Sequence, residues 1–180
     1  MKNPIIYCSV ATVLGIVAAM YPNDLQTSPE GLKLLSGYED CTKTAYRDVG
    51  GVWTCGMGAT KGIKPGTVWT EQQVAEAFVR DVKEAEQCVI KYYDGEYMPQ
   101  PVFDSVTSLV YNVGCYGTRW NAKANRPTSI NRFAQSHDWD KVCYHIGDFV
   151  NVGGKRVQGL VNRRTQEQKL CLNYKYYPQL

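Results

Sequence analysis

The sequence predicts an α+β protein that is mainly helical, with one small antiparallel sheet near the front of the chain and a helical C-terminal lobe. Two observations predict this class. Apolar residues recur at helical spacing over most of the chain, and a cluster of β-branched, aromatic and glycine residues lies between positions 46 and 66. At 180 residues the chain is long enough for one full domain, which can be divided into two lobes. We expect an N-terminal segment over 1–27 and a single domain over 28–180.

The first segment is an export signal. Residues 4–23 carry no charge, follow the basic Lys2 and end where Asp24 restores polarity. A cleaved signal peptide, cut after Ala19, is one interpretation. The other is a weak membrane anchor, because the apolar run over 4–20 spans only about 25 Å as a helix, against a bilayer core of about 30 Å. Its small and polar residues make the free energy of membrane insertion only weakly favourable, so such a helix can leave the bilayer again.

Helix and turn signals divide the rest of the chain. Ser28 and Pro29 predict a helix over about 29–40, and Gly50-Gly51 predicts the turn of a hairpin that includes Thr54. A capping box at Thr70 begins a long amphipathic helix, and a further helix ends before Gly114. Three more helix starts are predicted, at Thr128, Asp138 and Gly159.

Composition excludes several classes of function. The net charge of +3 gives only a mild preference for acidic partners, and the aromatic residues are not interleaved with a basic run, so we expect no nucleic-acid binding. The cysteines are dispersed singly without a CxxC pair, so we expect neither a metal nor another cofactor. Dispersed cysteines fit structural disulfides in an oxidising compartment. They are Cys8, Cys41, Cys55, Cys88, Cys115, Cys143 and Cys171.

Two carboxylates are candidates for acid and base chemistry. On the predicted first helix Glu39 falls on the stripe of leucines that faces inward, which favours a partly desolvated acid with a raised pKa. Asp48 precedes the Gly50-Gly51 turn, where a hairpin can fold it back toward Glu39. Taken singly, each has an ordinary interpretation, as a solvated helix end and a turn aspartate. Together they fit glycoside hydrolysis, which needs two carboxyl groups facing one bond.

Thr54 adds a hydroxyl that can position a water molecule between these carboxylates. Strand alternation points Trp53 and Cys55 to the opposite face, which makes Cys55 a packing residue rather than a catalytic one.

The residues that carry this chemistry resemble a known family. The run from Glu39 to Thr60, with its spacing of Glu, eight residues, Asp, five residues, Thr, is similar to the signature of phage-type lysozymes, the endolysins of glycoside hydrolase family twenty-four. The resemblance covers roughly residues 28–172. It continues through Phe103-Asp104, Tyr111-Asn112-Val113-Gly114, Thr128-Ser129-Ile130, Gly153-Gly154-Lys155 and Gly159-Leu160-Val161-Asn162-Arg163-Arg164. Cys55 and Met57 depart from the family's usual apolar and aromatic residues.

The resemblance implies a two-lobed, lysozyme-like fold that cleaves the β-1,4 bond between N-acetylmuramic acid and N-acetylglucosamine in peptidoglycan, for lysis of the bacteriophage's host. Glu39 is then the general acid, and Asp48 and Thr54 hold the attacking water. The implied substrate-binding residues are Tyr46, Asn112 and Arg163, with Arg164 as the alternative to Arg163. The ordinary interpretation of either arginine is a solvated helix charge. No cofactor is implied, and we expect a monomer.

The N-terminal segment resembles the signal-anchor-release type of some of these endolysins. Lys2 on the cytoplasmic side places residues 24–180 across the inner membrane. We therefore expect an enzyme tethered and inactive at the periplasmic face, then released into the periplasm. Cys8 can meet a partner only after release, with Cys41 the nearest candidate and Cys55 next. The other expected pairs are Cys88 with Cys171 and Cys115 with Cys143.

Three alternatives stay open. A lytic transglycosylase acts on the same polymer with one glutamate, a cysteine peptidase needs a cysteine paired with His137 or His145, and a tethered wall-binding module needs no catalysis.

Overall fold

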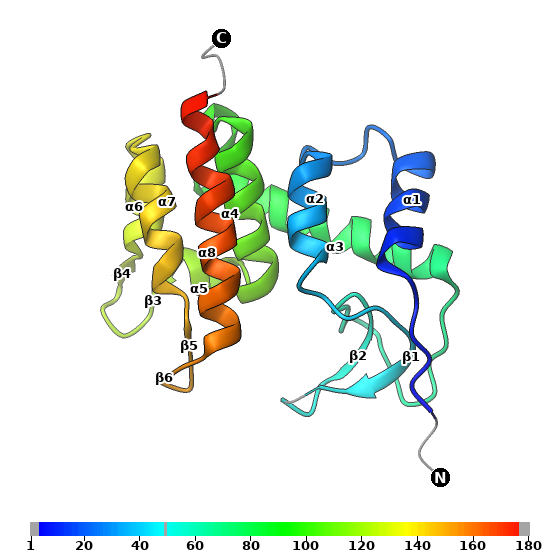
Figure 1. Cartoon of the computed structure of the whole chain (residues 1–180). Helices are drawn as coiled ribbons and strands as arrows, with labels where there is room; N and C mark the ends of the chain where they lie inside the picture. Colours follow the sequence, from blue (N-terminus) through cyan, green and yellow to red (C-terminus); the bar gives the residue numbers. More distant parts are fainter. Residues whose placement is uncertain (1–3, 49, 177–180) are drawn as a thin grey trace. The chain divides into compact units, whose positions relative to one another are not determined.

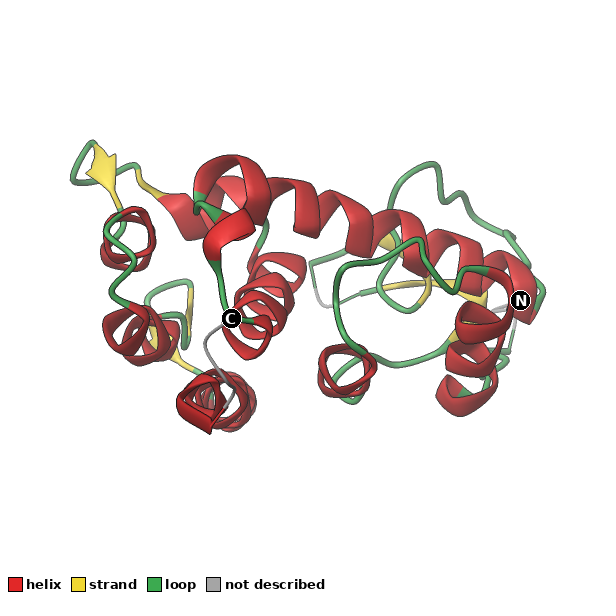
Figure 2. Ribbon diagram, turned by 90° about the horizontal axis from the view of Figure 1, so that it is seen from above, coloured by secondary structure: helices red, strands yellow, loops and turns green. Residues whose placement is uncertain are grey.

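The computed structural model describes residues 4–48 and 50–176. Lys2, on which the predicted orientation rests, and Val49 of the predicted hairpin lie outside the described residues. The chain divides into two compact units: unit 1 holds Met1–Gln26 and Leu35–Lys83, and unit 2 holds Thr27–Leu34 and Glu84–Leu180. Helices dominate and the strands are short (Figures 1 and 2), as the predicted fold class requires.

Three helices and one hairpin account for the first half of the chain. They are α1 (Val10–Met20), α2 (Pro29–Ser36), β1 (Thr42–Arg47), β2 (Trp53–Gly56) and α3 (Glu71–Tyr92). The elements of the second half are η1 (Gly95–Tyr97), α4 (Gln100–Val113), α5 (Cys115–Arg119), β3 (Trp120–Asn121), β4 (Arg126–Pro127), α6 (Ser129–Gln135), α7 (Trp139–His145), η2 (Ile146–Asp148), β5 (Asn151–Val152), β6 (Lys155–Arg156), α8 (Gln158–Leu172) and η3 (Asn173–Tyr176).

Local capping explains where the predicted helices begin. The predicted capping box is present at α3, because the Gln73 amide donates to Thr70 Oγ1 at 3.2 Å and the Thr70 amide donates to Gln73 Oε1 at 2.9 Å. Ser28 accepts from the Gly31 amide at the start of α2. Thr128 and Asp138 cap α6 and α7 in the same way, which confirms both starts.

The first predicted helix is too long. The structure ends α2 at Ser36, and Gly37, a poor helix former, follows directly. Glu39 therefore lies in the turn after the helix rather than on its leucine stripe, which corrects the reasoning that placed it there.

Two short hairpins in unit 2 were not predicted. β3 pairs with β4, and β5 pairs with β6, each over two residues. The turn of the second is formed by Gly153 and Gly154 at φ values of 56° and 79°, the left-handed conformations that a two-residue hairpin turn needs. The period-2 signal of such short strands is too brief to detect in a sequence.

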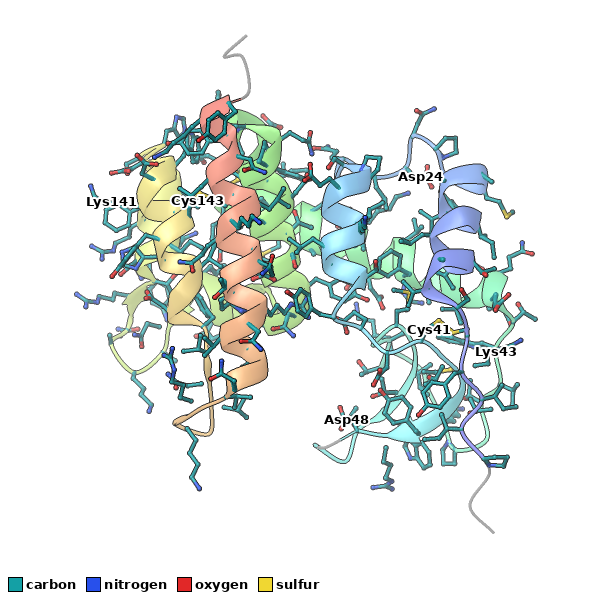
Figure 3. The ribbon with its side chains drawn as sticks, viewed as in Figure 1. Asp24, Cys41, Lys43, Asp48, Lys141 and Cys143 are labelled. Atoms are coloured by element: carbon teal, nitrogen blue, oxygen red, sulfur yellow. A yellow bond between two sulfur atoms is a disulfide. The ribbon has the colours of Figure 1, made fainter. Side chains whose placement is uncertain are left out.

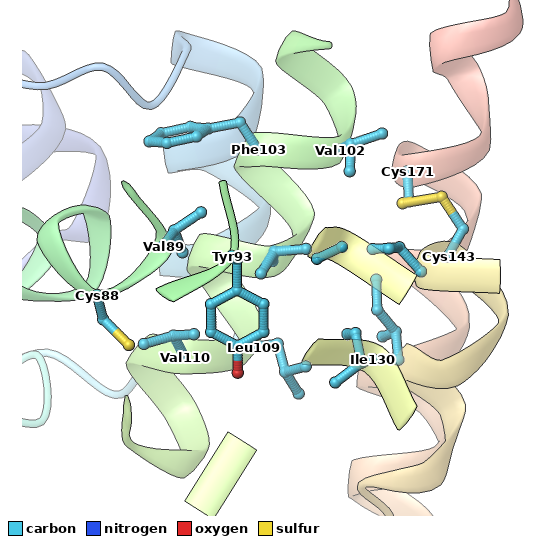
Figure 4. Close-up of a cluster of buried hydrophobic side chains, with 14 of the residues drawn as sticks. Cys88, Val89, Tyr93, Val102, Phe103, Leu109, Val110, Ile130, Cys143 and Cys171 are labelled. Carbon is cyan, nitrogen blue, oxygen red and sulfur yellow. A yellow bond between two sulfur atoms is a disulfide. The ribbon is translucent and has the colours of Figure 1, made fainter. Parts of the chain in front are cut away.

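The largest hydrophobic core belongs to unit 2 (Figure 4). The side chains that α4 contributes, among them Val102, Val106 and Leu109, are fully buried. The other buried members come from α3 and the residue after it, and from α6, α7, η2 and α8: Ala85, Cys88, Val89, Tyr93, Ile130, Ala134, Val142, Cys143, Ile146 and Cys171. This core gives unit 2 its own source of stability.

The N-terminal segment is part of unit 1. Its helix covers Val10–Met20 only, begins after the Ser9 N-cap and buries Val13 and Val17 on one face. Among the residues described, no helix is both long enough and apolar enough to cross a membrane. Before the helix the backbone is extended along β1, since the Lys43 amide donates to the Ile6 carbonyl and the Cys8 amide donates to the Cys41 carbonyl.

Three disulfides are present among the described residues. Cys8 is bonded to Cys41, as predicted. The other predicted pairs are wrong, because the structure joins Cys88 to Cys115 and Cys143 to Cys171. Their Cα atoms are 5.9 Å and 5.5 Å apart, within the short reach of a disulfide. Sequence spacing carries no information on which α-carbons approach this closely.

Candidate active site

The pairing of β1 with β2 determines on which face of the hairpin each candidate residue lies. Tyr46 pairs with Thr54 and Arg47 pairs with Trp53, so the two pairs point to opposite faces. The guanidinium of Arg47 lies 5.2 Å from the centre of the Trp53 ring, which agrees with a shared face. The side chains of Tyr46 and Thr54 therefore lie together on the other face.

Asp48 closes the turn of this hairpin (Figure 3). Its carboxylate Oδ1 accepts from the Val52 amide at 2.8 Å, while its own amide donates to the Val52 carbonyl at 3.0 Å. The turn itself runs through Gly51, whose φ of 78° suits glycine. Asp48 directly follows β1 and is bonded to Val52 across the turn, two residues beyond the Tyr46 and Thr54 pair.

Thr54 is buried, with 4% of its surface exposed, and its hydroxyl donates to the Val52 carbonyl at 3.3 Å. Cys55, its neighbour, is fully buried and is not in a disulfide. The predicted packing role of Cys55 is confirmed, and its inclusion among disulfide candidates was wrong.

Glu39 approaches the same group of side chains from the turn after α2. Its amide donates to the Ser36 carbonyl at 3.1 Å, and its side chain is partly buried. The pKa of the Tyr46 phenol depends on these neighbours. Burial raises this pKa above 10.0, and the charges of Asp40, Asp48 and Glu39 raise it further. The Tyr46 side chain thus lies within electrostatic range of both predicted catalytic carboxylates.

Arg163, another predicted substrate-binding residue, belongs to a buried ionic network in unit 2, and Asn112, which is exposed, contacts this network. Arg163 donates to Glu167 at 3.1 Å, and Arg164 donates to the other oxygen of Glu167 at 2.8 Å and to the Asn112 side chain. Both arginines are at least 96% buried. The ordinary interpretation of solvated helix charges is therefore wrong.

Glu167 was missed from the sequence, although its spacing from the two arginines was a usable signal. Residues three and four apart meet on one face of a helix, so Glu167 is within reach of both guanidinium groups. A carboxylate at this spacing from two consecutive arginines indicates an internal ion pair when the helix is buried.

The two histidines have acidic partners. His137 Nε2 lies 3.3 Å from Asp94, and His145 Nδ1 lies 2.7 Å from Asp148. No group of three or more metal-ligating side chains occurs among the residues that the structure describes. A pocket of about 400 Å³ also opens in unit 2, between the β3–β4 hairpin and Phe149, and it contains none of the predicted site residues.

Comparison with known proteins gives matches over most of the chain. A family model described as phage lysozyme matches residues 36–167. A SAR-endolysin of Escherichia phage P1 is 37% identical over 169 residues, covering 92% of this chain and 90% of the relative. A SAR-endolysin of Haemophilus phage HP1 is 35% identical over 177 residues, covering 93% of this chain and 95% of the relative.

Solved structures of the phage P1 endolysin Lyz match in two forms. The active form has a TM-score of 0.86 at 33% identity, covering 97% of this chain and 99% of the other. The secreted inactive form has a TM-score of 0.60 at 32% identity, covering 86% of this chain and all of the other.

Proposed function

This chain belongs to the phage lysozyme family and is a lysozyme that acts in lysis of peptidoglycan, and from that premise we propose that Glu39, Asp48 and Thr54 carry out its chemistry. One observation carries the assignment. Tyr46 lies opposite Thr54 on the hairpin, and the charges of both Asp48 and Glu39 act on the Tyr46 phenol. These observations support the proposal that a carboxylic acid, a second carboxylate and a hydroxyl act together in unit 1.

In the proposed reaction the bond between the anomeric carbon and the glycosidic oxygen breaks. Glu39 donates its proton to the departing oxygen. A water molecule held by Asp48 and the Thr54 hydroxyl attacks the anomeric carbon from the opposite face and gives its proton to Asp48. The result is hydrolysis with inversion.

We further propose that the N-terminal segment tethers the enzyme to the inner membrane in an inactive state before release. The relatives of phages P1 and HP1 carry the name SAR-endolysin, and the chain is more similar to the active form of the P1 protein than to its secreted inactive form. This similarity supports the proposal that the conformation described here is that of the released state. The Cys8–Cys41 bond forms after release, when both thiols give up their protons and two electrons to an oxidant of the periplasm.

The assignment is tested with purified peptidoglycan and three variants of the full chain. Glu39→Gln and Asp48→Asn should each lower the rate of turbidity loss by at least about 100-fold. The matched control is Glu76→Gln, which removes an exposed carboxylate of α3 and should retain full activity. An active Glu39→Gln enzyme contradicts the assignment.

Two further measurements separate the alternatives. Anhydro sugars among the products would indicate a lytic transglycosylase instead of a hydrolase. The intact mass of the recovered protein distinguishes a retained segment from a signal peptide cleaved after Ala19.

A further inference from the structure

The extended segment before α1 pairs with the beginning of β1, next to the stretch around Val68 that pairs with Thr44. Tyr7 pairs with Thr42 in the antiparallel sense, and the amides of Lys43 and Cys8 donate to Ile6 and Cys41 at 2.6 Å and 2.9 Å. The Ile6 amide donates to Thr44 Oγ1 at 2.9 Å. The disulfide between Cys8 and Cys41 then joins the two strands covalently.

Pairing across these strands places Tyr7 on the face that holds the catalytic candidates. Thr42, the partner of Tyr7, pairs in turn with Gly56, while Tyr46 pairs with Thr54. The register is irregular between these two pairs, but Thr42 and Tyr46 are four residues apart on β1 and Gly56 and Thr54 are two apart on β2. Because both spacings are even and paired residues share a face, we infer that Tyr7 lies on the face of Tyr46 and Thr54. Its neighbour Ile6 points to the opposite face.

The Tyr7 side chain is not used for packing. It is 67% exposed, although its backbone is fixed by hydrogen bonds and a disulfide on one side. Tyr7 also contributes to the raised pKa of the Tyr46 phenol, after burial and the three carboxylates, which agrees with two phenols close together on one face. An exposed aromatic ring at a fixed position beside carboxylates is a common way to bind a sugar, because the ring contacts apolar C–H groups and the hydroxyl forms hydrogen bonds.

We propose that Tyr7 is a substrate-binding residue, and that it and Tyr46 hold an N-acetylated sugar ring of the glycan strand next to the bond that is cut. The inference rests on the proposed function. Release of the N-terminal segment then has a second consequence besides formation of the Cys8–Cys41 bond. The released segment contributes part of the substrate-binding site. While Tyr7 is in the membrane, unit 1 lacks this contact even if its carboxylates are in place.

The test compares Tyr7→Ala with Ile6→Ala, which removes a neighbouring apolar side chain from the same strand but from the other face. Soluble, uncrosslinked peptidoglycan strands are the substrate, and kcat and KM are measured separately. Tyr7→Ala should raise KM roughly threefold to tenfold with kcat nearly unchanged, as expected for one lost aromatic contact. Ile6→Ala should leave both constants unchanged.

Intact mass and thermal melting of each variant report whether the Cys8–Cys41 bond and the fold are retained. Binding of insoluble peptidoglycan to Glu39→Gln, with and without Tyr7→Ala, gives a readout without turnover, and Tyr7→Ala should weaken it by the same factor. A wild-type KM in Tyr7→Ala overturns the inference, and so does an equal change in Ile6→Ala. If Glu39→Gln stays active, the proposed function itself fails, whatever Tyr7→Ala does.

Discussion

The two units are stabilised in different ways. Unit 2 has the large core around α4, two disulfides and a buried network in which one carboxylate, that of Glu167, holds two guanidinium groups. Unit 1 carries the candidate catalytic residues on and before a hairpin of two short strands, and the N-terminal segment pairs with the beginning of β1.

The difference bears on the tethered, inactive state that we propose. The interactions that stabilise unit 2 lie within residues 27–34 and 84–176, so they do not depend on where the first twenty residues are. The candidate site in unit 1 does depend on them, through the strand pairing and the Cys8–Cys41 bond. Stability and activity should therefore respond differently to changes in the two units.

The largest effect on stability is expected from Glu167→Gln in unit 2. The change removes the charge of the carboxylate that both buried guanidinium groups contact, and it should lower the free energy of unfolding by roughly 3–5 kcal/mol. Urea unfolding measures this change. The control Glu76→Gln, at an exposed position, should shift the midpoint little. A small loss in Glu167→Gln would show that these buried ion pairs contribute little to the stability of unit 2.

An effect of intermediate size on stability is expected from removing one disulfide from each unit. The double variants Cys8→Ser/Cys41→Ser and Cys143→Ser/Cys171→Ser remove bonds with similar sequence separations, 33 and 28 residues. Each should therefore cost about 2–4 kcal/mol of stability. At a temperature where both variants stay folded, only the first should lose lytic activity on purified peptidoglycan. Equal activities would remove the distinction between the units.

The smallest effect is expected from the alkaline pH dependence of Tyr46→Phe. Burial, and then the charges of Asp40, Asp48 and Glu39, raise the pKa of the Tyr46 phenol in the folded state above 10.0. The folded protein therefore keeps this proton where the unfolded chain has lost it. This contribution to stability is complete below about pH 10 and is lost as the pH rises through the folded pKa.

Chemical unfolding at a series of alkaline pH values checks this. Tyr46→Phe should show a shallower fall in stability than the wild type, and Tyr97→Phe, at an exposed tyrosine, should follow the wild type. Identical slopes in all three proteins would place the phenol of Tyr46 away from the carboxylates.

Sequence reasoning succeeded where the cause of a structure is local. The capping box at Thr70 and the caps at Thr128 and Asp138 depend on residues three apart, and the hairpin depends on a glycine turn. It failed at the Cys88 and Cys143 pairings, because tertiary packing decides which cysteines meet. Glu39 was found by its spacing to Asp48 and Thr54 within a family signature, although the helical stripe used to justify its burial ends at Ser36.

The hydrogen bond from the Val52 amide to Asp48 Oδ1 gives the two oxygens of this carboxylate different roles. One oxygen is committed to the turn, which fixes the rotation of the carboxylate and so the direction of the lone pairs on the other oxygen. An acceptor oriented in this way before the substrate arrives has no rotational freedom to lose and little reorganisation to undergo during the reaction. Architecture and reactivity can be separated here, because Asp48→Asn can keep the turn bond while it removes the charge, whereas Asp48→Ala loses both.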